Sequence, residues 1–133
     1  MHSIVVVSCM SGAVSEWVAR AESDFRVATR ESMVTAGPSY EAVCFHAQQC
    51  VEKLMKAVLI DRSVQPPRTH DLLALAAMVT ATIPTWTWPS LELSMLNSAA
   101  VGFRYPGDEV EKEDADEMLE VCTRLRVSLL ALL

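Results

Sequence analysis

The prolines of this 133-residue chain divide it into segments as long as single helices. Proline interrupts helical hydrogen bonding because it has no backbone N–H group. The interruptions fall at Gly37-Pro38, Pro66-Pro67, Pro84, Pro89 and Pro106. Between them, apolar residues recur at the spacing of one helix face, which predicts helices over residues 15–36, 39–61, 70–81, 90–102 and 109–133. Short links between such helices predict an all-α fold, an up-and-down bundle of four to five helices.

The composition supports this fold class and bounds the size of the protein. Hydrophobic residues make up 51% of the chain, and there are only 4 glycines, which is typical of packed helices rather than of twisted sheets. A chain of 133 residues corresponds to about one domain. We therefore expect a disordered leader over residues 1–10 and a single helical domain over residues 11–133.

The charge of the chain argues against a general nucleic-acid binder. Its formal net charge is −6, whereas proteins that bind phosphate backbones usually carry a basic patch. Eight acidic residues lie between Asp108 and Glu120, with Lys112 as the one base among them. Because the rest of the chain is close to neutral, a local basic patch stays open as an alternative.

The cysteines and the hydropathy pattern favour a cytoplasmic protein. Cys9, Cys44, Cys50 and Cys122 are isolated and form no CxxC pair, which is typical of free thiols in a reducing compartment. The apolar run near the N-terminus is too short for a signal sequence, and no run approaches the length of a membrane span. No ligand cluster has usable spacing, so we predict neither a metal site nor a cofactor.

One stretch, FHAQQCVEKLMKAV at residues 45–58, places several polar groups inside a predicted helix. Four of them fall within roughly an 80° arc of a helical wheel. These are His46, Gln49, Lys53 and Lys56. The pattern alone favours a solvated face, with Glu52 and Lys56 forming an ordinary surface salt bridge.

Two apolar residues modify this interpretation. Phe45 and Leu59 lie within or at the edge of the polar half of the same helix. Apolar side chains outside the intramolecular stripe indicate that this face packs against another chain. We therefore predict a homodimer.

Four stretches of the chain carry a resemblance to a known family. They are the start of the first predicted helix from Trp17 through Asp24, the run FHAQQCVEKLMKA at residues 45–57, Thr69-His70-Asp71-Leu72 after the proline-containing loop, and Arg104-Tyr105-Pro106. In their order and spacing they resemble the HEPN domain, the nucleotide-binding domain of higher eukaryotes and prokaryotes. The resemblance covers about residues 15–130.

The resemblance implies a HEPN-like helical bundle that dimerises and is often paired with a minimal nucleotidyltransferase. Many HEPN domains cleave RNA with an Arg that is followed, after four to six residues, by a His near the start of the last long helix. In that chemistry the Arg stabilises the charge of the phosphate, and the His transfers a proton as general acid or base. Arg104 stands at the place of the Arg, but Glu109, Val110 and Glu111 stand where the His belongs. A carboxylate there would repel a phosphate.

Three functions stay open at this point. The first is a non-catalytic HEPN-like binding protein in a toxin–antitoxin-like or nucleotide-associated system, which pairs with a minimal nucleotidyltransferase and binds a nucleotide or RNA. The second is a degenerate ribonuclease toxin that lacks the usual histidine. The third is a dimeric helical adaptor without a ligand.

For the first function we predict a shallow polar groove that holds a phosphate, and no catalytic residue. One wall carries His46, Gln49, Lys53 and Lys56, and the other carries Arg68, His70 and Arg104. Trp86 and Trp88, between two prolines, are expected to seal one end of the bundle rather than to stack on a base.

Overall fold

The computed structural model describes residues 11–101 and 109–133 of the chain. These residues form α2 (Gly12–Ser32), α3 (Tyr40–Asp61), α4 (Leu72–Thr82), α5 (Ser90–Ala100) and α6 (Lys112–Leu130), with no strand among them. The all-α bundle predicted from the sequence is confirmed. The predicted leader at residues 1–10 and Arg104 lie outside the described residues.

Polar side chains cap the starts of the first three helices. Ser11 Oγ accepts a hydrogen bond from the backbone N–H of Val14, and Ser39 Oγ accepts one from that of Ala42, both at 3.2 Å. Such caps satisfy backbone donors that have no partner within the helix.

The start of α4 differs from the sequence prediction. Its cap is Asp71, whose carboxylate accepts from the backbone N–H of Leu73 at 2.9 Å, so the helix begins at Leu72. The sequence predicted a helix from residue 70, but Thr69 and His70 precede the helix, and the Thr69 hydroxyl accepts from the backbone N–H of Asp71 at 3.1 Å. The proline-containing loop therefore extends two residues further, and it carries His70.

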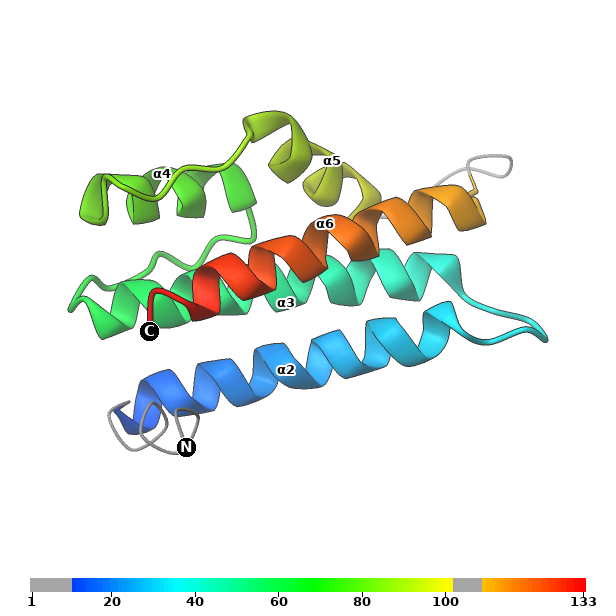
Figure 1. Cartoon of the computed structure of the whole chain (residues 1–133), viewed down its shortest axis with the longest axis horizontal. Coiled ribbons are helices and arrows are strands. Elements are labelled where there is room, and N and C mark those ends of the chain that lie inside the picture. Colours follow the sequence, from blue (N-terminus) through cyan, green and yellow to red (C-terminus); the bar gives the residue numbers. More distant parts are fainter. Residues whose placement is uncertain (1–10, 102–108) are drawn as a thin grey trace.

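Helix α3 lies at the centre of the bundle and packs against each of the other four described helices. In Figure 1, α2, α3 and α6 lie along the length of the molecule, and the shorter α4 and α5 lie to one side of them. Helices α3 and α6 begin at the same end, so the directions of the helices do not alternate strictly along the chain. With neighbours on several sides, α3 has apolar residues buried around most of its circumference.

The core contains three cysteines as free thiols, as predicted. Cys44, Cys50 and Cys122 are all fully buried. Burial is the main cause that raises the pKa of the Cys44 thiol to about 11, so this thiol stays protonated. The predicted thiol at Cys9 lies outside the described residues.

The two tryptophans fasten the connection between α4 and α5 to the end of α6. The Trp86 indole is buried, and its Nε1–H donates to Ser128 Oγ at 2.8 Å. The Trp88 ring stacks on that of Trp86 with a centroid distance of 6.4 Å, and the Arg124 guanidinium lies 5.6 Å from the centre of Trp88. These contacts agree with the predicted structural role of the pair.

No helix in the described ranges is long and apolar enough to cross a membrane. Within the same ranges, no three His, Cys, Asp or Glu side chains are grouped so that they could hold a metal ion.

Candidate functional site

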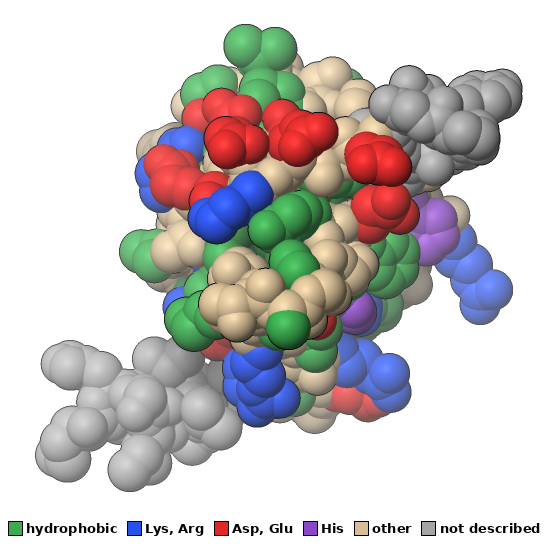
Figure 2. All heavy atoms as spheres, turned by 90° about the vertical axis from the view of Figure 1, so that its right-hand side faces the viewer, with side chains coloured by type: hydrophobic (Ala, Val, Ile, Leu, Met, Phe, Trp, Pro, Cys, Tyr) green, Lys and Arg blue, Asp and Glu red, His purple; other side chains and the backbone are tan. Residues whose placement is uncertain are grey.

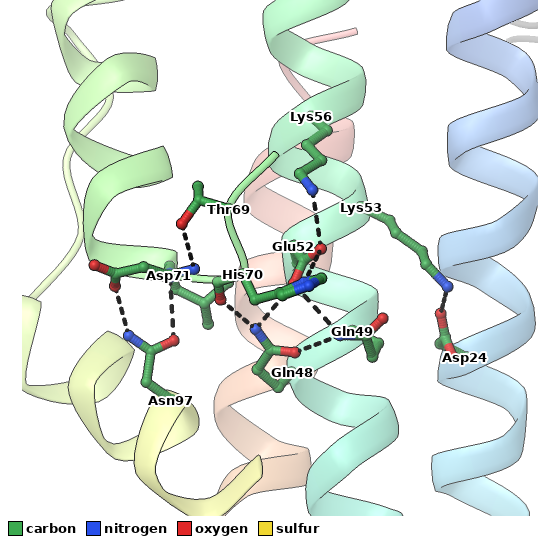
Figure 3. A network of polar contacts seen from close by, with 11 residues as sticks. Asp24, Gln48, Gln49, Glu52, Lys53, Lys56, Thr69, His70, Asp71 and Asn97 are labelled. Carbon is green, nitrogen blue, oxygen red and sulfur yellow. Dashed lines mark hydrogen bonds and ion pairs between the residues drawn. The ribbon is translucent and has the colours of Figure 1, made fainter. Parts of the chain in front are cut away.

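Glu52 on α3 is the centre of a buried polar cluster, the Glu52 cluster, which consists of Gln48, Gln49, Glu52, Lys56 and His70 (Figure 3). The residue is only 3% exposed. Its carboxylate accepts from Lys56 Nζ at 3.0 Å, from Gln48 Nε2 at 3.2 Å and from Gln49 Nε2 at 3.4 Å, and both its oxygens lie 3.1 Å from His70 Nδ1. A buried carboxylate requires such partners because desolvation of an unpaired charge is costly.

The Glu52 cluster also fixes the loop before α4. Gln48 Nε2 donates to the backbone carbonyl of His70 at 2.8 Å, in addition to its bond with Glu52. The His70 imidazole and its backbone are therefore both held by α3, although the His70 side chain is 82% exposed. This arrangement positions one polar, accessible ring against an otherwise buried network.

A second polar cluster, the Asp24 cluster, joins α3 to α2. Asp24 on α2 is buried, and its two carboxylate oxygens bind His46 Nδ1 at 2.8 Å and Lys53 Nζ at 2.6 Å. His46 and Lys53 are seven residues apart, so they lie on nearly the same side of α3. That side faces α2.

These two clusters overturn the interpretation of the 45–58 stretch as a solvated face. Gln48, Glu52 and Lys56 are buried, and the Glu52–Lys56 pair expected at the surface lies in the interior. The helical wheel failed here because it assumes one apolar side, whereas α3 has neighbours on several sides. Leu59 is also fully buried, so its expected exposure is wrong, whereas Phe45 is 46% exposed as expected.

A cavity of about 600 Å³ lies between α3, the start of α4 and the end of α5. It is lined by Phe45, Gln48, Gln49, His70, Asp71, Asn97, Ala100 and Val101. Asn97 on α5 links the two helices on one side of the cavity, α4 and α5. The Asn97 Oδ1 accepts from the backbone N–H of Leu72 at 3.1 Å, and the Asn97 Nδ2 donates to Asp71 at 2.8 Å (Figure 3). The lining is an aromatic and aliphatic surface with amide, imidazole and carboxylate groups.

The structure divides the seven residues predicted to form the groove. Gln49 and His70 line the cavity, and Lys56 joins them around Glu52 without reaching the lining. His46 and Lys53 are bound to Asp24 on the α2 side. Arg68 is exposed in the loop two residues before His70, and Arg104 lies outside the described residues. The predicted two-walled basic groove is therefore not what the described residues form.

The sequence interpretation missed Gln48, Asp71 and Asn97 as cavity residues. Gln48 stands outside the polar arc, and Asp71 entered only as part of the stretch Thr69-His70-Asp71-Leu72. Asn97 had one signal: it is the lone amide of residues 90–100, whose other members are apolar or small except for Glu92. An amide at such a position is typical of a buried hydrogen bond to a neighbouring backbone.

The helical bundle defines the class of fold, and comparisons with known proteins define the family. The crystal structure of an archaeal HEPN homologue superimposes with a TM-score of 0.64 and 24% sequence identity, over 87% of this chain and 93% of that chain, which shows a shared fold. The family model described as HEPN domain matches residues 14–129. The chain therefore belongs to the HEPN domain family. No curated protein matches it.

Proposed function

We propose that this HEPN domain is a non-catalytic binding module whose cavity between α3, α4 and α5 holds the base of a nucleotide. The observation that carries the proposal is the cavity itself, about 600 Å³ in volume. Pockets for small ligands are typically ~300–1,000 Å³ and combine apolar walls with a few polar groups. The cavity has a volume within this range, and its lining combines apolar and polar side chains.

The lining matches the chemistry of a nucleobase better than that of a bare phosphate. A base presents a flat face and an edge of hydrogen-bond donors and acceptors. The Phe45 ring offers a stacking surface, and the amides of Gln48 and Gln49 offer donors and acceptors. Neither Lys nor Arg is among the described residues that line the cavity.

A phosphate of the nucleotide would lie at the rim rather than inside. His70 is exposed at the edge of the cavity, and Arg68 is exposed two residues earlier in the same loop. Charge-assisted hydrogen bonds from such groups contribute about 1.5–3 kcal/mol each before ordering costs. Lys53 and Lys56, which were first assigned to this role, are already bound to Asp24 and Glu52. Binding is accordingly weak and sensitive to salt.

The non-catalytic part of the proposal rests on the sequence after Arg104. Glu109, Val110 and Glu111 occupy the positions where RNA-cleaving HEPN domains carry the histidine. The acids that follow also disfavour an approaching RNA backbone. Without a histidine at these positions, the Arg–His pair that supplies the acid–base step in RNA-cleaving HEPN domains is incomplete.

The proposal also includes partners. The exposed Phe45 and Val101 leave apolar surface at the mouth of the cavity, which supports a homodimer that covers it. HEPN domains are often paired with minimal nucleotidyltransferases, and we assign such a protein as partner in a toxin–antitoxin-like or nucleotide-associated system. Light scattering at micromolar concentration tests the homodimer. A strict monomer would contradict the proposal that a second copy covers the cavity.

The cavity is tested by titrating ATP, GTP and short RNA against the wild type and Phe45→Ala, at low and at physiological salt. Loss of one stacking surface should weaken nucleotide binding about tenfold, since base–aromatic stacking contributes ~1–3 kcal/mol. Leu91→Ala is the matched control, because Leu91 is an exposed apolar residue of α5 outside the cavity.

Equal affinity in the two variants, or no binding by the wild type, would contradict the cavity assignment. Light scattering on both variants separates a loss of dimer from a loss of ligand. The RNA arm also reports cleavage products, and their appearance would contradict the non-catalytic assignment.

A further inference from the structure

A second hollow, the α5–α6 groove, has an apolar floor. It measures about 390 Å³ and is lined by Ser94, Met95, Ser98, Ala99, Val110, Asp114, Glu117 and Met118. Met118 and Val110 are buried, and Met95 and Ala99 are half-buried. The groove uses other positions of α5 than the nucleotide cavity does, since Asn97, Ala100 and Val101 line that cavity.

The rim of the α5–α6 groove is acidic. Asp114 and Glu117 in the lining are exposed, and so are Glu109, Glu111 and Glu113 nearby in the chain. Lys112 is the one base between residues 109 and 120, and its Nζ is already bound to Asp116 at 2.6 Å. Figure 2, which faces the end of the bundle where α6 begins, shows acidic side chains gathered in its upper half.

We propose that the α5–α6 groove docks a segment of a partner protein that inserts an apolar side chain and carries Lys or Arg on either side of it. The apolar floor supplies burial for the anchor, and the flexible thioethers of Met95 and Met118 adapt to its shape. The carboxylates of Asp114 and Glu117 then face the cations of the partner, which sets the orientation and speeds the encounter.

Charge decides against two other occupants of this groove. The phosphates of a nucleic acid would meet Asp114, Glu117 and the exposed acids beside them, and like charges repel. A second copy of this chain related by a two-fold axis would bring the same acidic face against itself. The inference does not depend on nucleotide binding, because no residue is shared between the two sites.

Methionine methyl NMR on the full chain tests the location. The probe is an amphipathic peptide of Leu and Lys, and the control probe is the same peptide with Glu in place of Lys. The Leu–Lys peptide should shift the methyl signals of Met95 and Met118 and leave those of Met33 and Met55 unchanged. Met33 is exposed away from the groove, at the end of α2, and Met55 is buried in α3.

Two charge variants separate docking from general attraction to an acidic protein. Asp114→Asn with Glu117→Gln removes the charges in the lining, and Glu109→Gln with Glu113→Gln removes the same number of charges outside it. The backbone N–H of Glu111 donates to the Asp114 carboxylate at 3.1 Å. Asparagine keeps a side-chain oxygen that can accept the same hydrogen bond. The first pair should weaken peptide binding about tenfold, and the second no more than about twofold.

Three outcomes would overturn the inference. They are equal weakening by the two charge variants, peptide-induced shifts at Met33 and Met55 as large as those at Met95 and Met118, and shifts of the groove methyls by single-stranded RNA. The first two would indicate nonspecific charge attraction, and the third would indicate a nucleic-acid surface.

Discussion

The Asp24 and Glu52 clusters each join a carboxylate to a lysine of α3 and to a histidine, yet they differ in how far water can replace these contacts. In the Asp24 cluster, the Lys53 side chain is 23% exposed and that of His46 is 29% exposed. In the Glu52 cluster, the Lys56 side chain is 9% exposed and that of Glu52 is 4% exposed. A lysine that loses its carboxylate can therefore be hydrated in the first cluster but hardly in the second.

The two clusters also connect different parts of the fold. Asp24 reaches His46 and Lys53 across 22 and 29 positions of the chain, and it joins α2 to α3. Glu52 takes partners from its own helix and from His70, in the loop beside the cavity between α3, α4 and α5. The first cluster thus links two helices, whereas the second supports one wall of the proposed binding site, and variants can measure this difference.

The largest effect is expected for Glu52→Ala. The change leaves the Lys56 ammonium buried without its carboxylate and removes the common acceptor of Gln48, Gln49 and His70. Removal of one partner of a buried ion pair typically costs about 3–5 kcal/mol. Urea denaturation should show a loss of this size in the free energy of unfolding.

A compensating variant sharpens the same experiment. In Glu52→Gln with Lys56→Met no charge is left buried, and the free energy of unfolding should recover most of the loss. If Glu52→Ala costs no more than removal of the Asp24 charge, the distinction between the two clusters is wrong.

Sequence alone predicted the framework of the fold because it depends on local chemistry. Proline positions and apolar spacing gave the helices to within a few residues, and the caps at Ser11 and Ser39 lie close to the expected starts. The start of α4 lies two residues after the predicted one. Asp71 caps the helix and also accepts from Asn97, 26 positions away, a contact that the local sequence does not show.

The candidate site was less predictable because its parts meet only in three dimensions. Four residues share one arc of a helical wheel, but their partners lie on two different helices, α2 and α3; they are His46, Gln49, Lys53 and Lys56. Glu52, one of these partners, also binds His70 in the loop before α4. The i,i+4 spacing predicted the Glu52–Lys56 pair but not its burial, and no local pattern showed that Asp24 would neutralise Lys53. The cavity depends on Asn97, whose partners lie 25 and 26 positions away.

A smaller effect is expected for Asp24→Asn. The amide leaves Lys53 and His46 without a carboxylate, but both can turn partly toward water. We expect a loss of about 1.5–3 kcal/mol in the free energy of unfolding, as for a charge-assisted hydrogen bond. Urea denaturation measures it, and nucleotide affinity should not change.

Arg20→Ala provides a reference for a surface ion pair on the same helix. Arg20 bonds Glu16 at 2.9 Å, and their side chains are 63% and 65% exposed. Such pairs contribute about 0.5 kcal/mol or less. A cost of Asp24→Asn no larger than that of Arg20→Ala would show that the Asp24 cluster behaves as ordinary surface.

Small losses of stability are expected for the two histidines, one from each cluster. His70→Ala should cost less than about 1 kcal/mol, because its side chain is exposed and Glu52 keeps Lys56 and the two glutamines as donors. Gln48 still holds the backbone carbonyl of residue 70, so the loop keeps its position. His46→Ala should also cost little, because Asp24 keeps its bond to Lys53.

Nucleotide affinity, measured by calorimetry at low salt, distinguishes the two histidines. His70→Ala removes a partner for phosphate at the rim and should weaken binding about tenfold, which corresponds to one charge-assisted hydrogen bond. His46→Ala should leave the affinity unchanged, because His46 faces Asp24 on the α2 side. Equal losses in the two variants would mean that both clusters act on the ligand through the stability of α3. The Glu52 cluster would then have no special relation to the cavity.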